Sequence, residues 1–223
     1  MKKLWLTLAL MMSAAPAAAQ EVLEETAFTA AHWTSGLHMS AGLGMNLGYF
    51  DTDLVRENIG PGLNIQTDVG YYFGNIVALE VAGNVMLTQV SSALIWDTMM
   101  TFGVRARLPA WAGPEKSAPF FRLLGGRGPS VFIFKGEKPA EYDIGEGERT
   151  QIEGDVFGAA YGLFQDGREG TTWYMQLQYL THIYRKVEVI DDVNGVPEAI
   201  FTRRVSDGGA MHSISLTFGV LLF

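Results

Sequence analysis

Apolar residues alternate with small or polar residues along the whole stretch from Leu37 to Tyr49. The odd positions are apolar, while the even positions are small or polar and include Gly42, Gly44 and Gly48. A period of two predicts a β-strand, and this strand is longer than most strands of soluble proteins. Because a membrane barrel turns its apolar face toward lipid and its polar face toward the lumen, the pattern favours a transmembrane strand.

The same alternation recurs along the rest of the chain, between short polar turns. We therefore predict an all-β protein, a transmembrane antiparallel up-and-down β-barrel of about eight strands. The further segments are 63–73, 77–88, 96–108, 120–134, 156–164, 173–193 and 200–223. The run Gly125–Pro129 interrupts the fifth strand, so a bulge or bend is expected there.

The parity of each strand also predicts how the barrel would sit in a membrane. Side chains expected to face lipid near its middle are Leu43, Val81, Val104 and Leu177. Both ends of the barrel are expected in the periplasm, because the longer polar segments 51–60, 135–155 and 189–209 fall at the opposite side. Surface protease on intact cells should therefore cut within the last two of these segments.

The N-terminus has the features of an export signal. Lys2 and Lys3 precede an apolar core, and three alanines precede Gln20. We assign 1–19 to a signal peptide, 20–35 to a periplasmic N-terminal segment and 36–223 to the barrel. An uncleaved N-terminal anchor is the alternative.

Overall charge and cysteine content exclude several kinds of function. Cleavage of the signal peptide would change the formal net charge from −8 to −10 (−8 − 2), which disfavours nucleic-acid binding. The chain has no cysteine, so disulfides and thiolate sites are excluded. No two of its four histidines have metal-site spacing, and no cofactor is expected.

Charged residues at inward positions of three neighbouring strands predict a lumen charge cluster. A turn centred between Ser92 and Ala93 would place one acid and one arginine opposite each other. A three-residue turn at 73–75 would bring a second acid opposite the first. The cluster consists of Asp68, Glu80, Arg105 and Arg107.

Residues 36–223 resemble the small outer-membrane β-barrels of the OmpA-transmembrane-domain, OmpX and OmpW type. The resemblance rests on the signal peptide, the alternating hairpins and the chain-terminal Phe223. It implies a bacterial outer-membrane location, contact with outer-membrane lipid and lipopolysaccharide, a monomeric state, and an assembly signal at Phe223 read by the barrel-assembly machinery. The pattern departs from the family in one respect, because the apolar face of the last strand has the parity opposite to Phe223. Either Phe223 turns at the rim or a bulge resets the register.

Three classes of function are compatible with such a barrel. A lumen filled by side chains favours a structural or surface-interaction role, since barrels of about eight strands are just wide enough to be filled. A narrow solute pore is the second class. A lipid-modifying hydrolase is the third, but His212 and Ser213 are adjacent and would face opposite sides of a strand. We therefore expect no enzymatic activity.

Overall fold

A computed structural model describes residues 36–52, 59–74, 76–108, 117–135, 149–166, 171–193, 196–204 and 209–222. The expected signal peptide, the segment 20–35 and Phe223 lie outside these ranges. Within them, no helix is long and apolar enough to cross a membrane.

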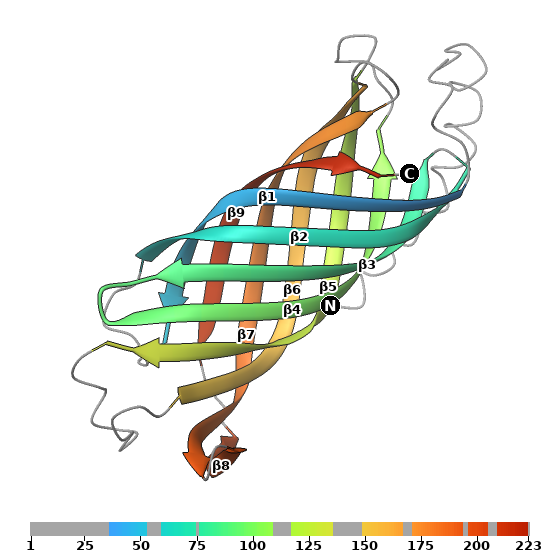
Figure 1. The fold of residues 1–223 in the computed structure, drawn as a ribbon. Coiled ribbons are helices and arrows are strands. Elements are labelled where there is room, and N and C mark those ends of the chain that lie inside the picture. Colours follow the sequence, from blue (N-terminus) through green and yellow to red (C-terminus); the bar gives the residue numbers. More distant parts are fainter. Residues whose placement is uncertain are drawn as a thin grey trace, which may run out of the picture. The chain divides into compact units, whose positions relative to one another are not determined.

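The described residues form nine strands in one antiparallel sheet (Figure 1). Their bounds are β1 Gly36–Asp51, β2 Ile59–Phe73, β3 Val77–Gln89, β4 Ala93–Arg107, β5 Ser117–Phe134, β6 Arg149–Asp166, β7 Thr172–Val193, β8 Val196–Arg204 and β9 Ala210–Leu221. Strands β1 to β7 pair in sequence order, β7 pairs with β9, and β9 pairs with β1. Eight strands therefore close an up-and-down barrel, as predicted.

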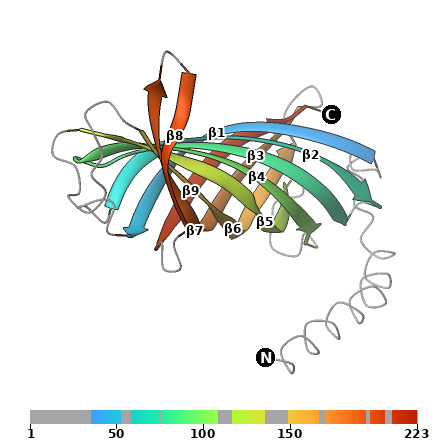
Figure 2. The same cartoon turned by 90° about the horizontal axis from the view of Figure 1, so that it is seen from below.

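Strand β8 is not part of the closed wall. It pairs with the last part of β7 alone, from Lys186 to Val193. Figure 2 shows this hairpin projecting beyond the other strands. We call the end of the barrel where β1 ends and β9 begins the distal end. The opposite end, where β1 begins and β9 ends, is the terminal end. The β7–β8 hairpin projects from the distal end.

Alternation along the strands separates the two faces of the wall as the sequence predicts. Leu43, Val81, Val104 and Leu177 are all exposed on the outside. Polar residues at the intervening positions are buried in the lumen, for example Asn84 and Gln176. An exposed wall that is apolar and an interior that is polar at many positions are typical of a barrel immersed in lipid.

In both predicted hairpins the centre of the turn lies one residue away from the expected position, so each residue pairs with a partner two positions from the expected one. Glu80 lies opposite Gly103, not opposite Arg105, because the β3–β4 turn is centred between Ser91 and Ser92. Within that turn, Val90 N donates to the carbonyl of Ala93 at 2.9 Å. The parity of each strand, and therefore the face on which each residue lies, is unchanged.

The β2–β3 hairpin is displaced in the same way. Asp68 lies opposite Ala82, not opposite Glu80, since Phe73 pairs with Val77 and the turn begins at Gly74. Gly74 has φ +65°, a left-handed conformation that glycine adopts without steric cost.

The prediction of a bulge in the fifth strand is wrong. β5 runs unbroken through Gly125–Pro129 and keeps one register with β6. Register shifts occur instead between Glu153 and Gly154 in the β6–β7 pairing and between Val189 and Ile190 in the β7–β8 pairing. β9 keeps one register with β1 as far as Leu221, so no bulge resets its apolar face.

Candidate functional site

A charge cluster fills the terminal half of the lumen. Five consecutive strands each supply one buried side chain at an inward position. We define the charge cluster as His38 of β1, Asp68 of β2, Glu80 of β3, Arg105 of β4 and Arg122 of β5.

Each carboxylate of the cluster contacts both arginines. Arg105 Nε lies 2.7 Å from Glu80 Oε1, and its Nη2 lies 3.1 Å from Asp68 Oδ1. Arg122 Nε lies 2.6 Å from Glu80 Oε2, and its Nη2 lies 3.8 Å from Asp68 Oδ2. Two negative and two positive charges therefore balance inside the barrel, which offsets much of the cost of removing each from water.

Further hydrogen-bonding side chains complete the cluster. His38 Nε2 donates to Glu80 Oε1 at 3.2 Å, and Ser40 Oγ donates to Asp68 Oδ2 at 2.6 Å. Gln66 Nε2 reaches the same Asp68 oxygen at 3.3 Å. Gln176 continues the network by donating to Gln66 at 2.6 Å. The carboxylates thus have hydrogen-bond or ion-pair partners on β1, β2, β4 and β5.

Glycines on the neighbouring strands make room for Glu80. Gly70 and Gly103 are its direct partners on β2 and β4. A Cβ at Gly70 would come within 2.5 Å of His38 Cε1 and 3.0 Å of Glu80 Cγ. A Cβ at Gly103 would lie 2.8 Å from the carbonyl oxygen of Leu123. The missing side chain at Gly70 therefore leaves space for His38 and Glu80, whereas that at Gly103 allows close approach of the β5 backbone.

Aromatic rings enclose the arginines at the terminal end. The Arg105 guanidinium carbon lies 5.0 Å from the ring centre of Phe120. The corresponding atom of Arg107 lies 3.9 Å from the ring centre of Tyr72 and 5.6 Å from that of Phe164. These distances are those of cation–π contacts.

The structure brings together three of the four residues that the sequence suggests for the cluster: Asp68, Glu80 and Arg105. Arg107 instead stacks on Tyr72. Arg122 and His38 belong to the cluster but were not among the expected members. The inward parity of Arg122 is a signal that could have identified it, whereas the interrupted pattern at Gly125–Pro129 left the register of its strand undetermined.

Three members of the cluster have groups that could in principle hold a metal ion. One ligand atom from each of His38, Asp68 and Glu80 lies within 4.8 Å of the others. Arg105 and Arg122, however, contact the same carboxylates. Two guanidinium charges at these oxygens would repel a cation, so the chemistry of the site is that of an ion-pair network.

The distal half of the lumen is filled mainly by apolar side chains, which we call the apolar core. It comprises Phe50, Met86, Val90, Ala93, Ile95, Met99, Leu124, Phe132, Ile152, Val156, Leu180, Tyr184, Val187 and Met211. A buried polar trio, Asp97, Ser130 and His182, lies in the same half. Sequence parity places Asp97 and His182 inward, but the uncertain course of the fifth strand gave no indication that Ser130 joins them.

The trio contains the residue types of a hydrolase but not the required arrangement. Ser130 donates to Asp97 and also lies 3.1 Å from His182 Nδ1. His182 Nδ1 and Asp97 Oδ1 are 4.0 Å apart. In a catalytic triad the histidine lies between the acid and the nucleophile. Here the serine lies between the other two, and all three side chains are buried.

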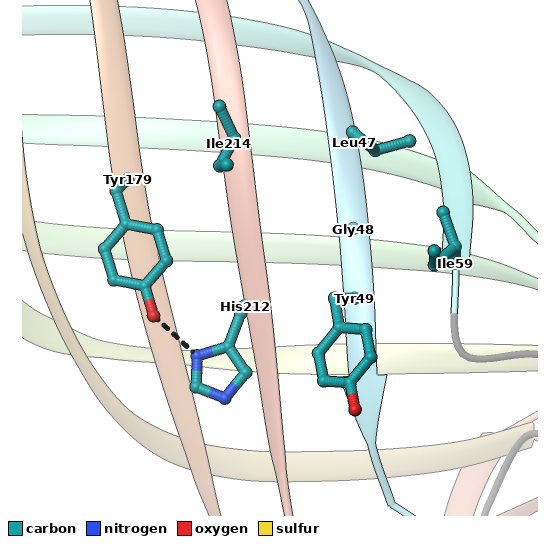
Figure 3. A pocket seen from close by; sticks show the side chains of 7 residues that line it. All are labelled: Leu47, Gly48, Tyr49, Ile59, Tyr179, His212 and Ile214. Carbon is teal, nitrogen blue, oxygen red and sulfur yellow. Dashed lines mark hydrogen bonds between the residues drawn. The ribbon is translucent and has the colours of Figure 1, made fainter.

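The outer wall carries a shallow groove near the distal end, across β7, β9, β1 and β2. Its volume is about 350 Å³, and its lining residues are Leu47, Gly48, Tyr49, Ile59, Tyr179, His212 and Ile214. Figure 3 shows the ring of His212 between those of Tyr179 and Tyr49. The neighbouring Ser213 is buried in the lumen, so His212 and Ser213 face opposite sides as predicted.

Comparison with known proteins gives a match in structure without a match in sequence. No protein-family model matches the chain, and no curated protein matches it. The chain is similar in structure to Neisserial surface protein A, with a TM-score of 0.56, 10% identity, and coverage of 84% of this chain and 96% of that one. It has the fold of a small outer-membrane β-barrel. At this identity the likeness shows the fold alone.

Two further structures match with lower scores. Ail, the attachment invasion locus protein of Yersinia pestis, has a TM-score of 0.43 and 13% identity, with coverage of 85% of this chain and 100% of that one. The outer membrane protein AlkL has a TM-score of 0.42 and 13% identity, with coverage of 85% and 90%.

Proposed function

We propose that this protein is a bacterial outer-membrane barrel whose lumen is closed, with a structural or surface-interaction role. The observation that carries the proposal is the burial of the charge cluster. Arg105 and Arg122 are 1% and 0% exposed, and both contact the two buried carboxylates. A water-filled path would leave such side chains exposed to solvent, so their burial supports a closed lumen.

The exposed wall supports a location in the outer membrane. Large apolar side chains project outward from the strands of the closed wall, including Leu43, Phe102, Leu177 and Phe218. The proposed orientation puts the terminal end in the periplasm and the distal end at the cell surface. Its partners would then be outer-membrane lipid and lipopolysaccharide around the wall, and the barrel-assembly machinery at Phe223 during insertion.

Conductance measurements on the purified barrel in planar bilayers test the proposal. The native protein should show no steady ion current. Glu80→Ala combined with Arg105→Ala removes one acid and one base and keeps the net charge. It should also show no steady current, because the apolar core still fills the distal half of the lumen. A steady current through the native protein would favour the narrow pore instead.

A second measurement addresses the hydrolase alternative. Lipid A from cells with and without the protein should have identical masses, because neither the buried trio nor the His212–Ser213 pair has a catalytic arrangement. If lipid A lacked an acyl chain only in cells that contain the protein, a purely structural or interaction role would be contradicted.

A further inference from the structure

The groove at His212 combines an apolar surface with a defined set of hydrogen-bonding groups. Ile59, Ile214 and Leu47 are each at least half exposed and form its apolar part. Tyr49 is the direct strand partner of His212 on β1, and Thr181 is its direct partner on β7. The imidazole stacks on Tyr179, with ring centres 6.1 Å apart and an angle of 11° between the ring planes.

Hydrogen bonds within this group determine which nitrogen of His212 carries the proton. Tyr179 Oη lies 2.9 Å and Thr181 Oγ1 lies 3.1 Å from Nδ1, and Thr181 donates to Tyr179 at 3.1 Å. If Nδ1 accepts from Tyr179, every hydroxyl proton of the group has an acceptor. If Nδ1 carried a proton, one hydroxyl would lose its acceptor. This network therefore favours the tautomer in which Nε2 carries the proton.

The free ends of these groups point in one direction. In Figure 3 the second ring nitrogen of His212 and the hydroxyl of Tyr49 both point away from Ile214 and Leu47, toward the distal end. Within the part of the chain that the structure describes, these two donors have no partner and lie at the distal mouth of an apolar groove.

The groove lies where the apolar wall gives way to polar residues. Toward the terminal end, the next outward residues of β9 are Ile214, Leu216 and Phe218, all exposed. Toward the distal end, Asp51 of β1 is exposed, and Arg185 of β7 pairs with Asp155. In a bilayer this is the level at which acyl chains end and ester or amide oxygens begin.

We propose that this groove binds one acyl chain of lipopolysaccharide, with its carbonyl or hydroxyl oxygen accepting from His212 Nε2 and Tyr49 Oη. Lipopolysaccharide is the occupant because the proposed orientation places the distal end in the outer leaflet, so this inference rests on the proposed function. The hydroxyls of Tyr179 and Thr181 position the imidazole, and Tyr179 also lines the groove.

Four variants separate the elements of the site. His212→Leu removes the donor, His212→Gln keeps a donor, and Ile214→Trp fills the groove without changing the histidine. Trp96→Phe is the matched control, because it removes another exposed hydrogen bond, from Trp96 Nε1 to Thr98 Oγ1 at 3.2 Å. β4, which carries Trp96, is four strands away from β9 around the closed barrel.

Each protein is folded into nanodiscs of dimyristoylphosphatidylcholine, with and without lipopolysaccharide, and the lipid retained after extraction is measured by native mass spectrometry. Native protein and Trp96→Phe should retain lipopolysaccharide in preference to phosphatidylcholine. His212→Leu and Ile214→Trp should retain about fivefold less, which corresponds to one lost hydrogen bond or its equivalent in contact. His212→Gln should retain more than His212→Leu.

Equal retention by the native protein and His212→Leu would overturn the site, and so would an equal loss in Trp96→Phe or a preference for phosphatidylcholine. Folding is followed separately by the heat-dependent shift of the barrel on gels. A native barrel that folds but retains no lipopolysaccharide refutes the lipid site alone, whereas a native chain that does not insert refutes the outer-membrane placement as well.

Discussion

The two halves of the lumen are filled by opposite kinds of side chain. At the terminal end, Asp68 and Glu80 meet Arg105 and Arg122 in a balanced ion-pair network. At the distal end, rings and aliphatic chains such as Phe132 and Ile95 pack together, and Asp97 has only Ser130 and His182 as its polar partners among the interactions described above. The side chains of both halves are buried, and this burial is the basis of the proposal that the lumen is closed.

This difference shows that inward parity defines a face and not a solvent environment. Charged side chains can be buried in a lumen when partners from adjacent strands neutralise them. Apolar side chains at the same parity fill the lumen by packing and depend less on the position of any single partner. The two halves should therefore respond differently to substitution, which the following experiments test.

The largest effect is expected for loss of one charge in the terminal half. Glu80→Gln leaves two guanidinium groups against one carboxylate and should lower the free energy of unfolding in lipid vesicles by about 3–5 kcal/mol. Glu80→Gln with Arg105→Gln restores the charge balance and should recover part of this loss. Denaturant titration of the two single variants and the double variant measures the coupling.

The control for Glu80→Gln is the same chemical change outside the barrel. Glu153 is exposed, so Glu153→Gln should leave the stability unchanged within error. If the double variant equals the sum of the two single variants, the contact between Glu80 and Arg105 is refuted.

In the distal half, truncation of a ring should be costly, while a change of shape should be tolerated. Phe132 is fully buried, and Phe132→Ala should lower the free energy of unfolding by about 3–4 kcal/mol. Phe132→Leu keeps most of the volume and should cost less than about 1.5 kcal/mol. Similar costs for the two variants, measured by the same titration, would show that this half is loosely packed.

The smallest effect is expected for the buried acid of the distal half. Asp97 has no arginine or lysine partner among the ion pairs of the described residues, and its contact with His182 is long, at 4.0 Å. Asp97→Asn therefore removes little ionic attraction and should change stability by less than about 1 kcal/mol. Asp68→Asn is the matched change in the charge cluster and should cost several times more. Equal losses in the two variants would contradict the distinction between the halves.

Sequence alone was sufficient to predict the faces of the strands but not their exact pairing. A period of two identifies which residues share a face, and it placed Asp68, Glu80 and Arg105 in the lumen correctly. The register depends on the turns, where Ser91 and Ser92 carry no strong preference for one turn over its neighbour. An error of one residue in the turn centre moved the partner of Glu80 from Gly103 to Arg105.

The cluster nevertheless forms with the different register, because Arg105 is two residues from Gly103 on the same inward face, within reach of the Glu80 side chain. The remaining members could not be predicted for two physical reasons. Arg122 lies on a strand whose glycines and proline resemble a break, although its backbone continues to pair with β6. The groove at His212 depends on residues of four strands, whose alignment is known only once the barrel is closed.

The pairing of β1 with β9 has a consequence for the order of assembly. Most other pairings in the barrel wall join strands that follow one another along the chain, whereas Ser40 meets Leu221 only when the last strand has arrived. The charge cluster comes from β1 to β5, so its ion pairs need only the first half of the chain. Until β9 docks, the wall has two open edges whose backbone groups cannot be satisfied by lipid. We therefore expect closure to be a late step of folding, acting on a half-barrel whose charges can already be neutralised.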